Sequence, residues 1–321
     1  MVANRDPSEI HITRIYDAPV RVVWKSWTEP AQAALWWGPR GFTLTSHSKD
    51  LRPGGIWHYT MHGPDGTDYP NKALYYEVET ERKLVYDHGG YDDRPPLFRV
   101  TVLFSESEGK TTMEMTMRFP SPAEAAESLK FIKQVGGFAT WDRLAEYLND
   151  LADDQACFVI TRTLSAPIER VFQMWLEPSQ LSQWLPPEGF QMRFLRADFQ
   201  VGGSCLFEMK HSSGMTFLAS FQFSDISHSQ RIEYIQQFCD VDEKPARHPG
   251  LPGFPSAMKT SVRFAAEGTE ATRITVVSRI LPETITSEID CFKQERVGMT
   301  QGWSRSFDQL EELLVKQSTG R

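Results

Sequence analysis

The sequence predicts an α+β fold that occurs twice in tandem, and three observations lead to this prediction. Residues 12–42 (ITRIYDAPVRVVWKSWTEPAQAALWWGPRGF) align without a gap with residues 160–190 (ITRTLSAPIERVFQMWLEPSQLSQWLPPEGF). In both copies, stretches of alternating apolar and polar residues follow, which is the pattern of strands with one buried face. Each copy ends in a long segment of helical periodicity. A strand, two short helices, about six antiparallel strands and a long helix indicate a layered α+β arrangement.

The repeat continues well beyond the first alignment. The same offset carries Tyr86 onto Tyr234, and the register then slips at residues 239–258 (CDVDEKPARHPGLPGFPSAM), whose proline and glycine content predicts a long loop. After the slip, Trp141 matches Trp303. A repeat of this length is too long for a solenoid, so the pattern indicates the duplication of a whole domain.

The domain boundary is expected between the two copies. A length of 321 residues favours two domains. The segment NDLADDQA (149–156) separates the last helical segment of the first copy from the first strand of the second. We therefore predict one domain at residues 1–150 and another at residues 157–317.

Each copy is expected to build its elements in the same way. Pro19 and Pro167 follow the first strand, at a position where a helix can begin without a free N–H group. A second short helix then carries Trp36 or Trp184, which we place at the floor or rim of the gap between the sheet and the long helix. In the strand GGIWHYTM, the apolar side chains of Trp57, Tyr59 and Met61 alternate with more polar ones. The matching strand GGSCLFEM has its apolar side chains at the same alternate positions.

Charge and composition exclude several classes of protein. The net charge is −8 and no Lys/Arg-rich run is present, which argues against a nucleic-acid partner. The first thirty residues lack the apolar core of a signal peptide, and no apolar stretch has the length of a membrane span. The four cysteines are widely spaced, without the pattern of a disulfide framework or a zinc site. These features predict a cytoplasmic protein without a metal or another cofactor.

Several segments resemble a known family. APVRVVWKSWTEPAQAALWWGPRGF, MHGPDGTDY, YYEVETERKLVY and GGFATWDRLAEYL are similar to the SRPBCC superfamily, in the branch named for homology to the C-terminal domain of the heat-shock-protein-90 ATPase activator. The resemblance implies a START-like helix-grip fold, with a curved sheet around the C-terminal helix and a cavity between them. Members of the family mostly bind apolar small molecules. The second copy departs from the family pattern, with HSSG for GPDG and Leu185-Pro186 for Trp37-Gly38.

Large aromatic and apolar side chains are the expected lining of a cavity for such a ligand. The predicted ligand-binding residues are Trp36, Trp37, Trp57, Tyr59, Tyr76, Met115, Phe138, Trp141, Trp184, Phe207 and Trp303. The competing interpretation is that these side chains simply fill the core, which is also typical of alternating methionines on a strand such as Met113, Met115 and Met117.

Catalytic residues are not predicted. His58, His62 and His88, together with Tyr59, Tyr86 and Asp87, form the one first-domain cluster that could titrate near neutral pH. Strand parity turns His58 and His62 away from Trp57 and Tyr59. The histidines of the second copy do not match them, and no GxSxG motif or phosphate-binding loop is present.

Three functions follow from the sequence. The first is a binding module for a hydrophobic or aromatic small molecule. The alternatives are a cyclase- or hydrolase-like enzyme acting on such a ligand, and a chaperone-associated protein of the ATPase-activator type. The family name suggests a chaperone as a partner, although nothing in this chain resembles the separate N-terminal domain of the eukaryotic activators. Whether the chain is an enzyme stays open, with a non-enzymatic role preferred.

The two domains are expected to differ in binding. The aromatic residues of the first copy are replaced by smaller or less polar ones in the second, where Leu185, Cys205, Phe207 and Ser224 match Trp37, Trp57, Tyr59 and Tyr76. Aromatic rings with polar tips can both stack on a ligand and form hydrogen bonds with it. We predict that the first domain is the more selective site, and that the second cavity is either wider or closed by the loop at 239–258.

Overall fold

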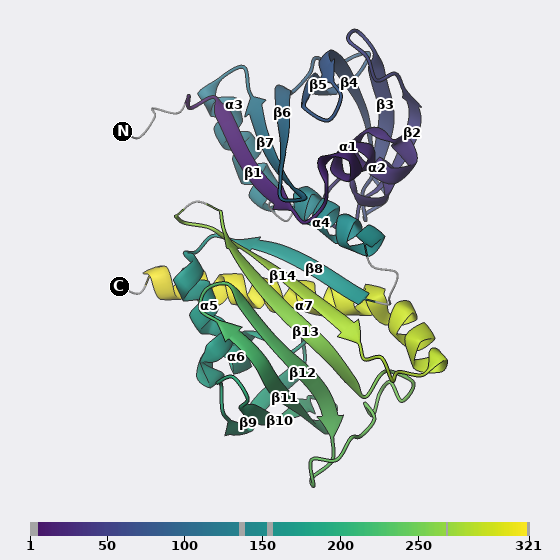
Figure 1. The fold of residues 1–321 in the computed structure, drawn as a ribbon. Helices are drawn as coiled ribbons and strands as arrows, with labels where there is room; N and C mark the ends of the chain where they lie inside the picture. The colour runs from purple at the N-terminus through teal and green to yellow at the C-terminus, as the bar shows by residue number, and fades with distance from the viewer. Residues whose placement is uncertain (1–5, 135–138, 153–156, 268, 320–321) are drawn as a thin grey trace. The chain divides into compact units, whose positions relative to one another are not determined.

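The computed structural model describes residues 6–134, 139–152, 157–267 and 269–319. Contacts divide the chain into two compact units, Met1–Ala152 and Asp153–Arg321. Figure 1 shows both units, and each is described by itself.

The first unit contains seven strands and four helices among the described residues. The strands are β1 (Glu9–Tyr16), β2 (Thr43–Lys49), β3 (Ile56–His62), β4 (Asp68–Glu79), β5 (Lys83–Gly90), β6 (Phe98–Ser107) and β7 (Lys110–Arg118). The helices are α1 (Val20–Thr28), α2 (Pro30–Trp36), α3 (Pro122–Gln134) and α4 (Ala139–Ala152).

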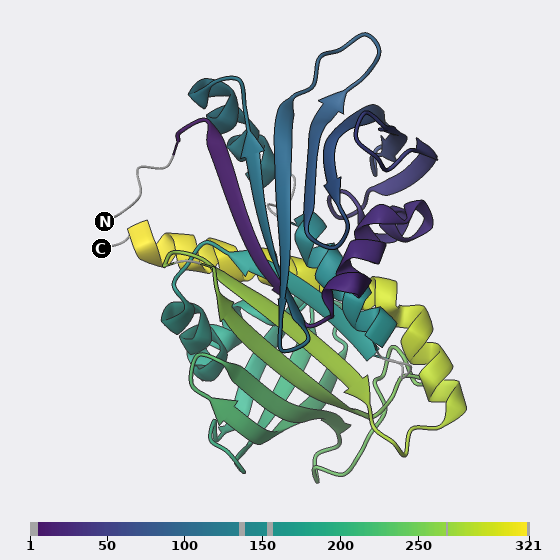
Figure 2. The same ribbon diagram turned by 45° about the horizontal axis from the view of Figure 1, so that its top comes forward.

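The second unit contains seven strands and three helices among its described residues. The strands are β8 (Cys157–Leu164), β9 (Phe190–Ala197), β10 (Ser204–His211), β11 (Thr216–Ser227), β12 (Arg231–Cys239), β13 (Ala257–Ala266) and β14 (Thr272–Ile280). The helices are α5 (Ile168–Leu176), α6 (Pro178–Trp184) and α7 (Thr286–Thr319). Both ribbon views show α7 extending across one face of the sheet of its own unit (Figures 1 and 2).

The two sheets have the same topology. Their antiparallel strands run in the orders β1-β7-β6-β5-β4-β3-β2 and β8-β14-β13-β12-β11-β10-β9. The first strand of each copy therefore pairs with the last, and the two short helices interrupt the chain between the first and second strands. Matching orders confirm the predicted duplication of a helix-grip α+β fold.

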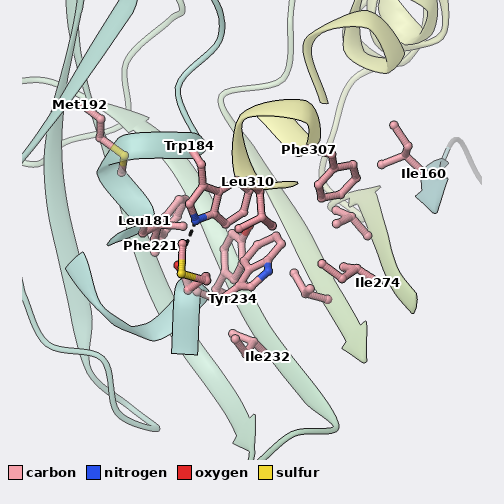
Figure 3. Packing of buried hydrophobic residues seen from close by; sticks show 14 of the residues in the cluster. Ile160, Leu181, Trp184, Met192, Phe221, Ile232, Tyr234, Ile274, Phe307 and Leu310 are labelled. Atoms are coloured by element: carbon pink, nitrogen blue, oxygen red, sulfur yellow. Dashed lines mark hydrogen bonds between the residues drawn. The ribbon is translucent and has the colours of Figure 1, made fainter. Parts of the chain in front are cut away.

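The tryptophan at the end of the second short helix is anchored identically in both units. The Trp36 indole N–H donates a hydrogen bond of 3.0 Å to the Ser26 carbonyl, and the Trp184 N–H donates one of 3.0 Å to the Met174 carbonyl. Both side chains are fully buried. Figure 3 shows Trp184 among the packed side chains of its core, close to Phe307. These two tryptophans tie α2 to α1 and α6 to α5, and their side chains belong to the hydrophobic cores of the two units.

Stacked tryptophans join the short helices to the C-terminal helix. Trp27 stacks on Trp141 in the first unit, with ring centroids 5.1 Å apart. Trp175 stacks on Trp303 in the second unit at 6.0 Å. A stacked indole pair contributes packing energy beyond the area that it buries, so these contacts fix the first short helix of each unit relative to its C-terminal helix.

The C-terminal helices differ from the expectation of one long helix per copy. In the second unit, α7 is a single helix of 34 residues. In the first unit, α3 and α4 flank residues 135–138, so the predicted site residue Phe138 lies outside the described residues. No helix in the described ranges is both long and apolar enough to cross a membrane.

Candidate functional site: two cavities

The first unit encloses a cavity of about 470 Å³, which we call the first cavity. Its wall comes from β1, strands β3 to β7, helices α3 and α4, and the turn that follows α2. The lining residues are Ile12, Trp37, Gly38, Pro39, Phe42, Met61, Tyr69, Asn71, Tyr86, His88, Gly89, Arg94, Leu97, Phe98, Val100, Met115, Met117, Ser128, Thr140 and Trp141. A volume of this size and a mostly apolar wall are typical of a small-molecule site.

The turn after α2 is held by an arginine of α4. The Arg143 guanidinium donates hydrogen bonds of 2.9 Å to the carbonyls of both Gly38 and Pro39, and one of 3.2 Å to that of Phe42. Gly38 has φ +96°, a left-handed conformation that glycine adopts without strain. The string WWGPRGF is therefore a turn whose backbone is fixed from behind, which presents Trp37 and Pro39 to the cavity.

A histidine and a tyrosine form the inner polar group of the first cavity. His88 Nδ1 lies 3.3 Å from the Tyr59 hydroxyl. Burial lowers the pKa of His88 to about 4 and raises the pKa of Tyr59 above its ordinary value. Both groups are therefore neutral at physiological pH, and they form hydrogen bonds rather than carry charge.

Two further polar groups reach the first cavity. Burial also raises the pKa of Tyr86 well above its ordinary value, and within the described part of the chain its hydroxyl has no hydrogen-bond partner. Arg94 donates a hydrogen bond of 2.6 Å to the Pro70 carbonyl and places a positive charge at the edge of the cavity. The first cavity thus combines a large apolar wall with a few hydrogen-bonding groups and one cation.

The second unit encloses a cavity of about 350 Å³, the second cavity. Its lining residues are Leu185, Pro187, Phe207, Met209, Phe217, Ala219, Phe221, Tyr234, Gln236, Phe238, His248, Leu251, Phe254, Glu295, Gly298, Met299, Gly302, Trp303 and Ser306. Three of them come from the loop between β12 and β13 that the sequence predicted. The His248 ring packs against Phe217 at 4.8 Å and Phe238 at 5.2 Å between centroids, so this loop forms part of the wall. The second cavity is the smaller of the two, not the wider.

The structure divides the predicted site residues into groups. Trp37, Met115 and Trp141 line the first cavity, and Phe207 and Trp303 line the second. The side chains of Trp36, Trp57, Tyr59 and Trp184 are buried in the cores behind the cavities. Tyr59 still reaches the first cavity indirectly, through its contact with His88.

Tyr76 lies apart from the other predicted residues. Its side chain is 41% exposed, its hydroxyl donates a hydrogen bond of 2.7 Å to Asp87, and the Arg99 guanidinium lies 4.1 Å from its ring centroid. Tyr75, its neighbour in β4, takes the buried face instead, so strand alternation turns Tyr76 outward. Tyr76 is therefore a residue of the outer face of the sheet.

The set predicted from the sequence omits His88, Tyr86 and Arg94. Strand alternation contains the signal for two of them, because Leu84, Tyr86 and His88 share one face of β5. His62, by contrast, pairs with Asp68 at 2.6 Å, on the face that parity assigned to it. No sequence pattern signals Arg94, which reaches the cavity from the loop between β5 and β6.

Fold and cavities together define a tandem helix-grip protein with a ligand-binding architecture. Residues 17–149 and 165–315 each match the family described as Activator of Hsp90 ATPase homolog 1-like protein. The chain belongs to this family, with two copies of its domain. A comparison with curated proteins finds no match.

Solved structures include similar single and double domains. A protein from Chromobacterium violaceum is 29% identical over 50% of this chain and 96% of its own, with a TM-score of 0.39. An AHSA1 protein from Silicibacter pomeroyi is 17% identical over 50% of this chain and 99% of its own, with a TM-score of 0.39. The di-domain ARO/CYC BexL from the BE-7585A biosynthetic pathway is 12% identical over 95% of this chain and 97% of its own, with a TM-score of 0.39.

Proposed function

We propose that the protein binds a hydrophobic small molecule with a planar or aromatic body in the first cavity. One observation carries the proposal: an apolar cavity of about 470 Å³ into which a small number of neutral hydrogen-bonding groups converge. Apolar walls supply most of the binding free energy of such a ligand, and a few polar groups set its orientation.

The polar groups suggest where the ligand carries its oxygen or nitrogen atoms. The Tyr86 hydroxyl and the ring of His88 can each form a hydrogen bond inside the cavity, and Arg94 favours a partial or full negative charge at the edge. Leaving either inner group without a partner in the complex weakens binding, because buried polar groups need hydrogen bonds. A ligand with one polar group at its inner end fits this arrangement better than a pure hydrocarbon does.

A binding role fits these groups better than catalysis does. General acid–base catalysis works best with a pKa close to the working pH. Burial moves the pKa values of His88 and Tyr59 in opposite directions, both away from neutrality, so neither group exchanges protons readily at pH 7. The presence of two cavities also favours ligand binding over a role that uses only the outer surface.

Native mass spectrometry of the purified full-length chain tests the proposal. We expect a co-purified small molecule, or a 1:1 complex with members of a panel of flavonoid-like compounds. Ser128 lines the cavity from α3, so Ser128→Phe fills ligand space from a partly exposed helix position. Ala126→Phe adds the same ring on the exposed side of α3 and is the matched control.

The two variants separate the outcomes. Ser128→Phe should lower affinity by at least about tenfold, because a ring of this size takes the space of several ligand atoms. Ala126→Phe should bind as the parent does. Equal affinity of the parent and Ser128→Phe, or no binding by any compound together with no co-purified mass, contradicts the proposal.

A further inference from the structure

The two cavities carry opposite charges. Among the residues that the structure describes, Arg94 is the one charged side chain that lines the first cavity, and no Asp or Glu accompanies it. In the described lining of the second cavity the charged side chain is Glu295, and no Lys or Arg accompanies it. Burial lowers the pKa of His248, so this residue adds no positive charge at neutral pH. The second cavity is therefore suited to a cation.

Aromatic rings surround the second cavity. Those that line it are Phe207, Phe217, Phe221, Tyr234, Phe238, Phe254 and Trp303. The π face of each ring is negative, and rings that enclose a cation attract it without forming hydrogen bonds. Lining by several rings and one carboxylate is the chemistry that recognises organic ammonium ions.

Glu295 is placed to act on a ligand in the second cavity. It lies one helical turn before Gly298 on α7, and a Cβ atom added to Gly298 would lie 3.4 Å from Glu295 Oε2. The carboxylate therefore folds over the glycine that lines the cavity. In the described ranges of the chain, no hydrogen bond or ion pair engages Glu295, so its charge is available to a ligand.

The helix itself leaves room for the ligand. Gly298 and Gly302 are spaced one turn apart on the face of α7 that lines the cavity. A Cβ atom added to Gly302 would meet nothing within 4 Å. Alanine would thus fit at Gly302 and would favour the helix more than glycine does. A glycine at this place keeps open the space between α7 and the aromatic rings.

We propose that the second cavity binds a compact organic ammonium ion with apolar or aromatic substituents. The cation lies among the aromatic rings, and Glu295 balances its charge from α7. This proposal rests on the proposed function in treating the cavities as ligand sites, and it assigns the second cavity a ligand class different from that of the first.

Calorimetric titration of the full-length chain with benzyltrimethylammonium tests the proposal. The reference ligand is its uncharged isostere, neopentylbenzene, which has the same shape. Binding of neopentylbenzene is measured by saturation-transfer NMR. We expect the cation to bind at least about tenfold more tightly than the isostere, in line with a desolvated cation–π contact and one nearby carboxylate.

Charge and location are tested with separate variants. Glu295→Gln should lower affinity for the cation by about tenfold and leave the isostere unchanged. Asp290→Asn removes the same charge from an exposed position of α7 outside the cavity lining, and it should bind the cation as the parent does. Gly302→Leu fills the second cavity and should abolish binding of the cation. Gly302→Ala should weaken this binding, and circular dichroism checks that the variant is folded.

Any one of four results would overturn the proposal, and the first three concern the variants and the isostere. They are equal affinity for the cation and its isostere, an unchanged affinity of Glu295→Gln, and loss of cation binding in Ser128→Phe instead of Gly302→Leu. Absence of any cation binding would overturn it as well. Of these results, only loss of cation binding in Ser128→Phe concerns the first cavity, and the proposed ligand of that cavity is tested independently by the Ser128→Phe and Ala126→Phe pair.

Discussion

The two units share their anchors and differ in the residues that face the cavities. Trp36 and Trp184 are equivalent, and each donates a hydrogen bond from its indole N–H to the carbonyl at the equivalent position of the preceding helix, Ser26 or Met174. The residues at the cavities, by contrast, differ between the two units. His88 and Tyr59 in the first unit, which contact each other, correspond to Gln236 and Phe207 in the second.

The comparison indicates that the duplicated scaffold and its ligand space changed independently. Anchor residues are buried on all sides, so any change leaves a hole or a clash. A residue at a cavity has free space on one side, so its size and polarity can change with little effect on packing. The interacting pair His88 and Tyr59 is replaced at both positions. Phe207 has no hydroxyl group, and Gln236 is a half-buried polar side chain that lines the second cavity.

The largest effect is expected where the units are the same. Trp36→Ala and Trp184→Ala should each lower the free energy of unfolding by about 3–5 kcal/mol, because each removes a fully buried ring and its hydrogen bond. Denaturant unfolding followed by circular dichroism measures this loss. If either variant loses less than about 1 kcal/mol and also loses ligand binding, that tryptophan contacts ligand rather than anchoring the core.

A smaller effect should separate the two turns. Arg143→Met should lower the free energy of unfolding by about 2–3 kcal/mol, since a charged donor to several carbonyls is lost from a partly buried site. Arg305 is the matching residue of the second unit, where it pairs with Glu188 at the surface. Arg305→Met should cost less than about 1 kcal/mol. Equal losses in the same denaturation experiment would contradict the assignment of Arg143 as the clamp of the turn.

The pH dependence of stability should report on His88. Its folded pKa of about 4 lies below the ordinary value of 6.5, so between these values the unfolded chain binds more protons than the folded chain does. Stability therefore falls as the pH is lowered from 6.5 to about 4, by at most about 1.4 kcal/mol per pH unit. His88→Gln, which copies Gln236, should make this slope shallower. Lowered pKa at His248 leaves part of the slope in both proteins.

Parallel slopes for the parent and His88→Gln would contradict this prediction. The unfolding free energy of both proteins, measured by denaturation at a series of pH values from 4 to 8, provides the check.

The smallest effect is expected at Tyr76. Tyr76→Phe removes an exposed hydrogen bond to Asp87 and should change the unfolding free energy by less than about 1 kcal/mol, with ligand affinity of the first cavity unchanged. Tyr76→Ser, which copies Ser224, should likewise leave affinity unchanged in calorimetric titration. Weaker ligand binding by either variant would contradict this prediction and would show that Tyr76 contributes to the ligand site.

The fold could be predicted because burial of one sheet face imposes a period of two that both copies repeat. The sites were harder, and Trp36 and Trp37 show why. Helix α2 ends at Trp36, and Trp37 leaves the helix in an extended conformation with ψ +134°, so adjacent rings point to the core and to the cavity. The end of a helix can be predicted from sequence only to within a residue or two. A shift of one residue decides whether a tryptophan at this helix end lies in the core or at the cavity.

Adjacent tyrosines raise the same difficulty on a strand. Tyr75 and Tyr76 occupy opposite faces of β4, and an irregularity in the pairing with β5 falls at this point. Sequence reasoning that chooses the wrong member of the pair assigns an exposed ring to the cavity. Arg94, Leu251 and Phe254 come from loops, whose positions follow from tertiary contacts rather than from any periodicity.

The closely packed indoles of the first unit have an optical consequence. Trp27, Trp36, Trp37, Trp57 and Trp141 form a continuous set whose neighbouring ring centroids lie 5.0–6.2 Å apart. Excitation absorbed by one ring migrates through neighbours at such short separations before light is emitted. A molecule in the first cavity that quenches Trp37 or Trp141 therefore lowers the emission of the whole set. The intrinsic fluorescence of the protein consequently reports occupancy of that cavity with a larger change in signal than quenching of one indole would give.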